Sequence, residues 1–563
     1  MSLIVNHAKN QIEKLINDAV KSACKKGELE TTGELSRFSI EVPANREHGD
    51  YAVNAALVWA KALRLPPRAI AEKILANTQT DGTYIERMEI AGPGFINFYL
   101  NDEYLADILL DVVKKGASYG RSNFGEGKRV LVEFVSANPT GPMHIGNARG
   151  GALGDCLAAV LEAAGYYTER EFYINDAGNQ INKFALSLDI RYRQIFGDPE
   201  EMPEDSYHGE DIINHAKAFA EKYGDSFIGR DESARKKALV DFALPKNIEG
   251  LKSDLLKYRI EYNTWFKESS LHQNGETDRI IDLLKKSGYT YEQEGALWFK
   301  ATDFGCDKDF VLVRANGFPT YVVPDIAYHY NKLEVRKFDK AIDILGADHH
   351  GYVPRLKAAL KALGIDDTRL DAVLMQMVRL VRDGEVIKAS KRSGKAITLV
   401  TLLDEVPIDA ARFFFNLREP NSHFDFDLDL AVSESSNNPV YYVQYAYARI
   451  CSIMRNLAEE GISCENASKD QLKLLKAPEE KELILHIASF TDEIIQSAKS
   501  YDPARITHYV LELATLFHKF YSACRVKDAD KDLSRARITL CNDTATVIKN
   551  VLDMLKITTP EKM

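Results

Sequence analysis

Residues 134–155, FVSANPTGPMHIGNARGGALGD, decide the fold, because two prolines, a lone histidine and five glycines separate an apolar run from an alanine-rich helix. The preceding run, RVLVEFV at 129–135, has the near-continuous apolar pattern of a buried parallel strand. Glycines where a strand turns into a helix let the backbone approach a ligand, and the helix N-terminus offers unpaired N–H groups to an anion. The segment therefore predicts half of a nucleotide-binding unit. By themselves, the glycines could equally serve packing.

The chain on either side of this segment predicts a multidomain α/β protein. Residues 1–110 combine amphipathic helices with a strand–turn–strand pattern, which indicates a small α+β domain. Within 111–434, further apolar runs near 170, 341 and 372 alternate with helical patterns, so a Rossmann-like core with a parallel sheet is expected. A polar, mostly helical insertion is expected inside this core at about 185–300. Helical patterns dominate 435–563 and predict an all-α helical bundle.

Composition restricts the class of protein. The 563 residues are 45% hydrophobic and 28% charged, as in ordinary globular proteins, and no apolar run reaches the roughly 18 residues of a membrane span. The seven cysteines are too scattered for a disulfide framework or a Cys-x-x-Cys zinc site, and the N-terminus lacks a secretory pattern. A cytoplasmic protein without membrane association is therefore expected. The net charge of -11 argues against a chain that is basic throughout, although residues 379–395 form a basic patch.

Two short motifs point to nucleotide chemistry. His-Ile-Gly-Asn at 144–147 and Lys-Ala-Ser-Lys-Arg-Ser-Gly at 388–394 resemble, in this order, the two signatures of class I aminoacyl-tRNA synthetases. A third string, LGADHHGY at 345–352, resembles the class I position that contacts ribose or the adenylate. Without the first motif, a solvated charge run would be the simpler interpretation of the lysines. The resemblance implies a set of ATP-binding residues: His144, Gly146, Asn147, Gly346, Asp348, Lys388, Ser390 and Lys391.

The third string also contains residues of metal-ligating type. Asp348, His349 and His350 are adjacent. Three neighbours on one loop rarely converge on one ion, and no other histidine or cysteine cluster completes a shell. No protein-held metal is therefore predicted.

Longer strings narrow the resemblance to one family. The strings VEFVSANPTGPMHIGNARGGALGD, YINDAGNQI, PTYVVPDIAYH, KASKRSGKAITL and NNPVYYVQYAYARI are similar to those of arginyl-tRNA synthetases of the bacterial type, and the resemblance extends to the last residue. It implies that the chain activates arginine with ATP to arginyl-adenylate and pyrophosphate, then transfers arginine to the 3′ end of tRNA(Arg). It also implies Mg²⁺ bound with the ATP or pyrophosphate and a monomer that requires no protein partner. A role for zinc is not expected.

Recognition of arginine imposes its own requirement. The guanidinium is planar and always charged, so a selective pocket needs carboxylates that accept hydrogen bonds in pairs. Tyr321 and Asp325 lie four residues apart, on one face if their segment is helical, and match the guanidinium-reading pair of the family. Glu133 and Asn138 match family positions near the amino and carboxylate groups of the substrate, and Ser136 is predicted to bind arginine with them.

These assignments compete with simpler structural ones. Without the resemblance, Tyr321 would be interpreted as a packed core aromatic and Asp325 as a helix-capping or surface acid. Glu133 differs, because an acid inside an apolar strand is costly unless it is paired or functional.

Neither reaction step needs a protein nucleophile. Catalysis is therefore expected from positioning and charge stabilisation, with His144, Asn147, Lys388 and Lys391 as the catalytic residues. Asn147 replaces the second histidine of the signature. Its amide can donate a hydrogen bond but cannot carry charge, so contact with phosphate is expected in weakened or altered form.

The terminal regions concern the RNA partner. Tyr441 and Tyr445, in the helical C-terminal region, match the anticodon-binding module of the family and could stack on unpaired bases, although the same spacing suits ordinary helix packing. The N-terminal region resembles the additional domain that contacts the tRNA elbow. Two alternatives are a class I nucleotidyl transferase acting on a small acid and a non-catalytic, RNA-binding relative. The second is disfavoured because the signature residues are present.

Overall fold

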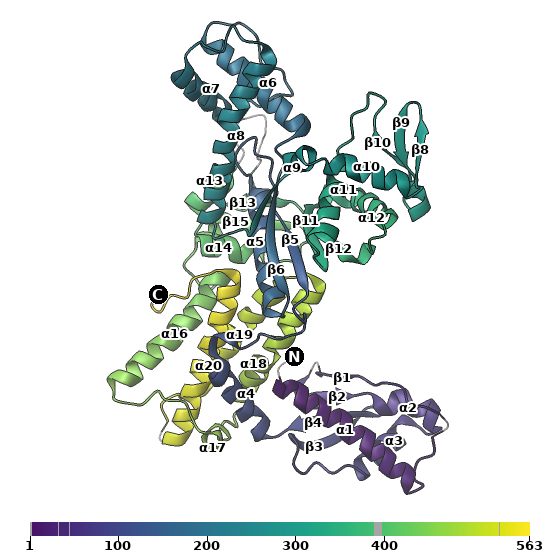
Figure 1. Cartoon of the computed structure of the whole chain (residues 1–563). Coiled ribbons are helices and arrows are strands. Elements are labelled where there is room, and N and C mark those ends of the chain that lie inside the picture. The colour runs from purple at the N-terminus through teal and green to yellow at the C-terminus, as the bar shows by residue number, and fades with distance from the viewer. Residues whose placement is uncertain (1–2, 32, 44, 388–396, 529) are drawn as a thin grey trace.

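The computed structural model describes residues 3–31, 33–43, 45–387, 397–528 and 530–563. A central parallel sheet lies between a helical extension at one end and two further units at the other, the N-terminal α+β domain and the C-terminal bundle (Figure 1). This arrangement confirms the predicted fold class. Among the helices of the described residues, none is long and apolar enough to cross a membrane.

The N-terminal domain is a four-stranded antiparallel sheet of order β1-β2-β4-β3, covered by helices. Trp59 is buried at its centre and donates its indole N–H to the Ser36 carbonyl at 2.7 Å. The amphipathic helix expected at the N-terminus buries its apolar residues against this domain. The elements are α1 (Leu3–Lys25), β1 (Ile40–Glu41), β2 (Tyr51–Val53), α2 (Ala55–Leu63), α3 (Pro67–Ala76), β3 (Ile85–Ala91), β4 (Phe95–Leu100) and α4 (Asp102–Lys115).

The central sheet has five parallel strands in the order β12-β11-β5-β6-β7. The chain leaves β5, crosses by helix α5 to β6, and later returns on the other side of β5 as β11, so the strand order reverses at β5. Ligands bind at such a reversal, beyond the carboxyl ends of the strands. The elements are β5 (Arg129–Glu133), α5 (Ile145–Ala163), β6 (Tyr167–Ile174), β7 (Thr264–Lys267), β11 (Lys340–Gly346) and β12 (Leu370–Met375).

Helix α5 packs unusually close to the sheet because glycine occurs where the two touch. A Cβ placed on Gly154 would lie 2.2 Å from the ring of Phe134. Some of the signature glycines therefore serve packing, as the simpler interpretation of that stretch proposed.

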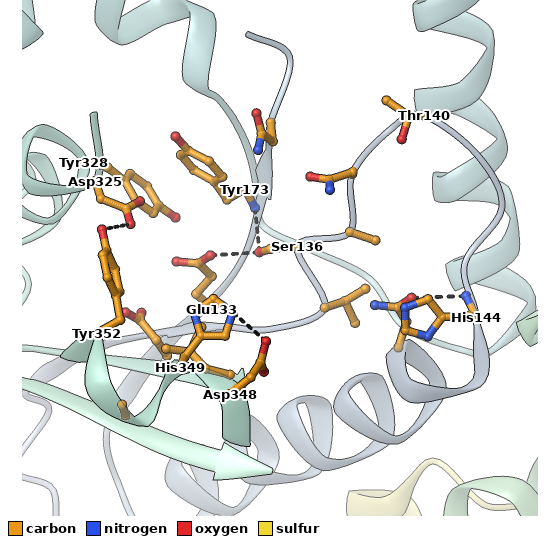
Figure 2. Close-up of a pocket in the computed structure, with 18 of the residues that line it drawn as sticks. Glu133, Ser136, Thr140, His144, Tyr173, Asp325, Tyr328, Asp348, His349 and Tyr352 are labelled. Atoms are coloured by element: carbon orange, nitrogen blue, oxygen red, sulfur yellow. Dashed lines mark hydrogen bonds and ion pairs between the residues drawn. The ribbon is translucent and has the colours of Figure 1, made fainter. Parts of the chain in front are cut away.

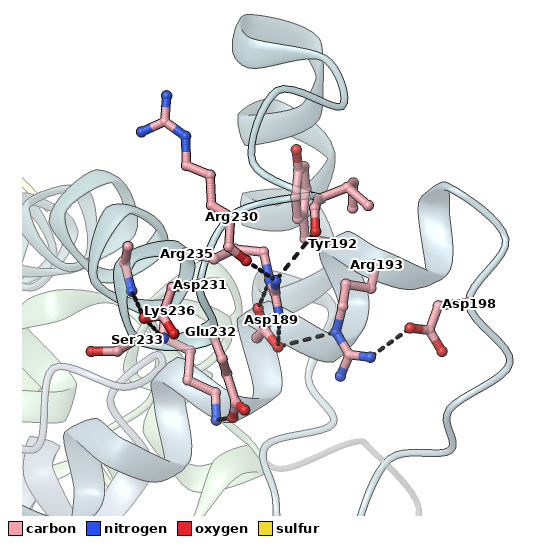
Figure 3. A network of polar contacts seen from close by, with 12 residues as sticks. Asp189, Tyr192, Arg193, Asp198, Arg230, Asp231, Glu232, Ser233, Arg235 and Lys236 are labelled. Atoms are coloured by element: carbon pink, nitrogen blue, oxygen red, sulfur yellow. Dashed lines mark hydrogen bonds and ion pairs between the residues drawn. The ribbon is translucent and has the colours of Figure 1, made fainter.

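The helical insertion forms its own small core. Helices α6 (Gly178–Ile195), α7 (Glu210–Tyr223) and α8 (Glu232–Lys257) pack together. The buried carboxylate of Asp189 on α6 joins α6 to α8, because it accepts hydrogen bonds from Arg193 on α6 and from Arg235 on α8 (Figure 3). Arg193 also bonds Asp198 at 2.5 Å, which fastens the segment after α6 to the same network.

The stretch expected as one helical insertion at about 185–300 is not continuous. Residues 264–267 form β7, an edge strand of the parallel sheet, because the ring of Trp265 stacks on Phe172 of β6 at 4.5 Å. A second excursion follows as the antiparallel sheet β10-β9-β8 with neighbouring helices, and it continues beyond residue 300. Its elements are α9 (Glu268–Gln273), α10 (Glu276–Lys286), β8 (Thr290–Gln293), β9 (Ala296–Phe299), β10 (Phe310–Val313) and α11 (Val322–Tyr330). Helix α12 (Val353–Ala362), which packs against α11, lies between β11 and β12 in the chain.

The apolar run near 372 makes two strands instead of one. The chain turns after β12 and enters a separate three-stranded sheet of order β14-β13-β15. This sheet carries the start of the segment that contains the second signature motif. Its elements and neighbours are β13 (Val378–Arg382), β14 (Glu385–Val386), α13 (Leu399–Glu405), α14 (Ile408–Phe415), β15 (Phe424–Asp427) and α15 (Leu428–Val432).

The C-terminal bundle is helical throughout its described residues, and two of its helices also pack against α5. The elements are α16 (Pro439–Glu459), α17 (Lys469–Leu472), α18 (Pro478–Ser500), α19 (Ala504–Ala523) and α20 (Lys531–Leu555).

A buried acid on α5 joins the catalytic core to the bundle. Asp155 Oδ2 accepts from Arg412 of α14 at 2.6 Å, and Asp155 Oδ1 accepts from Arg170 of β6 at 2.9 Å and from Lys556, after α20, at 3.1 Å. Burial opposes ionisation of Asp155, but the three cations outweigh it and hold the pKa of this carboxyl below its usual value. We call these four residues the Asp155 cluster.

A second buried acid, Asp543 of α20, is expected to destabilise the bundle at high pH. Its side chain is 2% exposed, and Oδ2 has no hydrogen-bond partner among the described residues. Burial raises the pKa of Asp543 well above its ordinary value. Where the folded carboxyl keeps a proton that the unfolded one has lost, stability falls by about 1.4 kcal/mol per pH unit.

Asp543→Asn removes this titration. We therefore expect the free energy of unfolding of the parent chain to decrease relative to that of Asp543→Asn as the pH rises from 5 to 9. Urea denaturation at three pH values measures the difference. Parallel pH profiles for the two proteins would contradict the assignment.

Candidate functional site

A cavity of about 810 Å³ opens at the carboxyl ends of the parallel strands (Figure 2). Its walls come from the end of β5 and the signature loop, the end of β6, the helix after β10 and the loop after β11. This is the strand-order reversal at which a ligand is expected. Of the residues predicted from the sequence, seven line it: Glu133, Ser136, Asn138, His144, Asn147, Asp325 and Asp348.

The signature residues form the N-terminus of helix α5. His144 is its N-cap and accepts a hydrogen bond from the Gly146 N–H through Nδ1 at 3.2 Å, and Asn147 Oδ1 accepts from the His144 N–H at 3.1 Å. Gly146 does not line the cavity but supplies one of the donors at this helix end. Asn147 therefore caps the helix with its oxygen. The same amide retains a nitrogen donor, and the residue lines the cavity.

The first residues described after the second signature motif contact the first motif. Lys388, Ser390 and Lys391 lie outside the described residues. Directly after them, the Ile397 carbonyl accepts from the Ile145 N–H at 3.2 Å, and the Met143 carbonyl accepts from the Leu399 N–H at 2.9 Å. Residues 397–399 thus lie beside the N-terminus of α5.

The backbone between β5 and the signature loop is strained. Val135 and Ser136 have φ values of 70° and 39°, in the left-handed region that a β-branched residue such as valine rarely adopts. This conformation aims the Ser136 hydroxyl, which donates to Glu133 Oε1 at 2.8 Å and accepts from the Tyr173 N–H at 3.1 Å. Such strain persists only where the surroundings enforce it, and it clusters at functional sites.

Glu133 is buried together with three further charged or titratable groups. Lys332 is 0% exposed, and its Nζ lies 2.5 Å from Glu133 Oε2 and 2.9 Å from Asp343 Oδ1. His329 Nε2 lies 2.6 Å from Asp343 Oδ2. Lys332 sits in a π-helical segment, Asn331–Val335, that follows α11, and such segments are frequent at functional sites. We call Glu133, His329, Lys332 and Asp343 the Lys332 cluster.

The pKa values within the Lys332 cluster diverge. Burial raises the pKa of Glu133 above its usual value, although the Lys332 ammonium opposes the shift. Burial acts on Asp343 in the same sense, but Lys332 and His329 outweigh it and hold the pKa of Asp343 well below its usual value. Glu133 faces the cavity, and burial and the Lys332 ammonium act on its pKa in opposite directions.

The Lys332 cluster does not suit a metal ion. Glu133, His329 and Asp343 offer ligand atoms within 4.8 Å of one another. The ammonium of Lys332 lies between the two carboxylates and supplies the positive charge that a cation would bring. The cluster is therefore complete without an ion.

The predicted guanidinium pair is divided in this structure. Asp325, in the first turn of α11, lines the cavity and accepts a hydrogen bond from the Tyr352 hydroxyl. Tyr321 precedes α11, is 70% exposed and lies outside the cavity, with its ring centroid 5.9 Å from that of Tyr352. It borders a smaller cavity of about 190 Å³, which Tyr352 also lines.

The loop after β11 forms the opposite wall. Gly346 ends the strand without lining the cavity, and a Cβ there would meet Asp348 Oδ1 at 2.4 Å, so only glycine leaves this carboxylate its position. Asp348 and His349 both line the cavity, and the Asp348 side chain is 85% exposed.

Several lining residues were not found from the sequence. Tyr173 and Tyr352 gave no local signal, and Asp211 enters from the insertion, with its buried Oδ2 unpartnered among the described residues. Asp343 could have been found, because it is an acid inside the apolar strand AIDILG, as Glu133 is in RVLVEFV. Lys332 could not, because its burial depends on partners from two distant strands.

Comparison with known proteins identifies the family. The model for the class I (R) tRNA synthetase catalytic domain matches residues 108–427, the model for the arginyl-tRNA synthetase N-terminal domain matches 10–100, and the model for the DALR anticodon binding domain matches 443–563. An arginine–tRNA ligase of Caldanaerobacter subterraneus subsp. tengcongensis is 53% identical over 563 residues, covering 100% of both chains. The chain belongs to the arginyl-tRNA synthetase family.

Solved structures agree with this membership. A putative arginyl-tRNA synthetase from Campylobacter jejuni superposes with a TM-score of 0.74 at 32% identity, covering 82% of this chain and 100% of that one. The arginyl-tRNA synthetase of Thermus thermophilus has a TM-score of 0.74 at 22% identity, with 98% and 100% covered, and supports the fold alone.

The tyrosines predicted to contact RNA lie at the start of α16 in this member of the arginyl-tRNA synthetase family. Tyr441 is half-buried, whereas Tyr445 is 40% exposed. The Tyr445 ring lies 5.9 Å from that of His518 on α19, and Arg449 donates to its hydroxyl at 3.4 Å. The structure thus presents Tyr445 at the surface but partly packed, as the alternative of a helix-packing stripe proposed.

Proposed function

We propose that this chain joins arginine to tRNA in two steps within the cavity of about 810 Å³. A carboxylate oxygen of arginine attacks the α-phosphorus of ATP, and the bond to the β-phosphate breaks to release pyrophosphate. A hydroxyl oxygen of the terminal tRNA ribose then attacks the carbonyl carbon of the adenylate, and AMP leaves. The observation that carries the proposal is the signature helix N-terminus in a cavity at the strand-order reversal.

The ATP end of the cavity is the α5 N-terminus. His144, Gly146 and Asn147 would present N–H donors and a positive helix end to the phosphates, and Gly346 and Asp348 would contact the ribose. Lys388 and Lys391 would add positive charge, and Ser390 a hydroxyl donor, as the adenylyl group transfers, and Mg²⁺ would bind the leaving pyrophosphate. The adjacency of Ile145 and Ile397 supports this pairing.

The arginine end is the wall that carries two carboxylates. Glu133, fixed by Ser136, would accept the α-ammonium group, Asn138 would orient the carboxylate, and Asp325 would accept from the guanidinium. Tyr321 would have to turn inward past Tyr352 to contact the same group.

The remaining assignments concern the RNA and the cell. The domains at 1–110 and 435–563 would hold the tRNA elbow and the anticodon, the latter through Tyr441 and Tyr445, around a catalytic domain at 111–434. The enzyme would act as a cytoplasmic monomer.

The decisive experiment is arginine-dependent ATP–pyrophosphate exchange, with and without tRNA(Arg), with lysine and citrulline as control substrates. Exchange with arginine but neither control supports the proposal. Adenylation of a different small acid would favour a nucleotidyl transferase. Binding of tRNA without exchange or charging would favour a non-catalytic relative.

Asp325→Asn tests the arginine end. We expect KM for arginine to rise about 100-fold, because loss of one charge from a desolvated, hydrogen-bonded pair costs about 2–5 kcal/mol. KM for ATP should not change. Asp282→Asn, an exposed acid on α10 outside the cavity, is the matched control. An unchanged KM for arginine in Asp325→Asn would refute the assignment.

A further inference from the structure

A second large hollow, of about 800 Å³, lies far from the strand-order reversal. Three parts of the chain enclose it: the first turns of α1, the connecting segment 115–124, and the last turns of α18 in the bundle. The ion pair between Lys9 of α1 and Asp492 of α18, at 3.1 Å, joins two of its walls. The start of α1 lies beside the bundle in Figure 1. We call this hollow the junction groove.

The junction groove is basic, although the chain as a whole carries a net charge of -11. Its lining includes the cations Lys9, Lys115, Arg121 and Lys499 and a single acid, Asp492. Arg121 and Lys499 are exposed and form no ion pair with any described acid. Their charge is therefore not neutralised within the described part of the chain.

An exposed aromatic ring lies beside these cations. Phe124 is 40% exposed, and Lys499 Nζ lies 5.0 Å from the centre of its ring. Serine hydroxyls and side-chain amides complete the lining, among them those of Ser118, Ser122 and Asn123. Hydroxyls and amides that accompany lysine and arginine are typical ligands of phosphate and sugar, and an exposed ring in a basic groove offers a surface on which a base can stack.

Charge complementarity and the exposed ring favour one kind of occupant. Two cations without an acidic partner among the described residues, next to an exposed aromatic ring in a hollow of about 800 Å³, fit a polyanion that also carries bases. We propose that the junction groove binds the ribose–phosphate backbone of the tRNA, with one unpaired base stacked on Phe124. This inference rests on the proposed function, because it takes the tRNA as the substrate of the cavity.

Charge reversal tests the backbone contact. The double variant Arg121→Glu/Lys499→Glu should bind tRNA(Arg) about 30-fold more weakly at low salt. The slope of log affinity against log salt should become shallower by about 1.5, because each lost phosphate contact removes roughly 0.7–0.9. The kcat at saturating tRNA and the KM values for ATP and arginine should stay as in the parent, since neither residue lines the cavity.

Two further variants distinguish the possible causes of weaker tRNA binding, namely net charge, local charge and stacking. Lys285→Glu/Lys308→Glu changes the net charge equally at exposed lysines without ion pairs elsewhere, and it should leave affinity and salt slope unchanged. Phe124→Ala should weaken binding about 10-fold with the parent salt slope, because it removes stacking and no charge. Thermal unfolding of every variant checks that each remains folded.

The outcomes test the junction groove and the proposed function independently. If Arg121→Glu/Lys499→Glu bound tRNA(Arg) with the same affinity and the same salt slope as the lysine control, the proposed tRNA contact at the junction groove would be wrong, even if the parent charges tRNA normally. Weaker binding in both double variants by the same factor would likewise overturn it, because net charge alone would then explain the loss. Failure of the parent to charge tRNA with arginine would instead overturn the proposed function.

Discussion

Substitution of Asp155 by leucine is expected to lower the free energy of unfolding by about 3–5 kcal/mol, the range measured when one partner of a buried ion pair is removed. Asp155 and Arg412 are both 0% exposed, so the guanidinium would remain buried without its carboxylate. Arg170 and Lys556 would lose the same acceptor. The measurement is urea denaturation at neutral pH.

The lowered pKa of Asp155 predicts how the stability difference between the two proteins changes with pH. The folded pKa of Asp155 is lowered, so its contribution is present above the unfolded pKa and is lost as the pH falls through the folded value. The stability difference between parent and Asp155→Leu should therefore shrink below about pH 4. A difference that stays constant through this range would contradict the assignment.

A double variant tests whether the lost stability comes from the unpaired buried charge of Arg412. Asp155→Leu/Arg412→Met replaces both buried charges by apolar groups and should regain part of the loss, although the Arg412 hydrogen bonds to the Leu555 and Tyr258 carbonyls also disappear. A double variant less stable than Asp155→Leu would contradict this account. The cluster ties α20 of the bundle to the helix whose N-terminus carries His144, so we also expect kcat to fall in the single variant.

Substitution of Lys332 by methionine should have an effect of similar size, about 3–5 kcal/mol, because Glu133 and Asp343 would share a buried space without their common cation. A second effect is specific to the arginine end of the cavity. Burial already raises the pKa of Glu133, and Lys332 is the strongest opposing influence. Without it, the pKa of Glu133 should rise further, so that Glu133 keeps its proton to higher pH and loses its attraction for an ammonium group.

The pH profile distinguishes this role from a purely structural one. The groups that face Glu133 are Lys332, Asp343 and His329, so the remaining acid and histidine cannot replace the ammonium fully. In Lys332→Met, KM for arginine should be raised at pH 7 and should recover as the pH increases, while KM for ATP stays flat.

The control for this substitution lies just beyond the segment that carries Lys332. Lys337→Met removes an exposed lysine that pairs with Glu334, and it should alter neither stability by more than about 0.5 kcal/mol nor the profile. A KM for arginine in Lys332→Met that is raised equally at every pH would show that Lys332 acts through packing alone.

Local pattern was sufficient for the class of fold. RVLVEFV, the glycine-rich stretch and the alanine-rich helix became β5, the signature loop and α5, because a buried strand, a close backbone approach and a helix cap each leave a signature within a few residues. The same locality made Glu133 conspicuous, since an acid in an apolar strand is unusual wherever that strand lies.

Local pattern was insufficient where a residue depends on distant partners. TWFK, at 264–267, is too short for its own pattern to predict a strand, and it forms one because it pairs with β6. The run near 372 forms two strands because its second half pairs with β15.

By itself, then, the sequence determined the strand, loop and helix around the first signature, the two signature motifs and the resemblance to one family, because these depend on neighbouring residues. Only the tertiary structure decided the burial of Lys332, the position of Tyr321 outside the cavity and the capping role of Asn147. It alone brought together the walls of the junction groove. The cost of burying a charge, and the shape of a cavity, depend on groups that meet only when strands and helices far apart in the chain pack together.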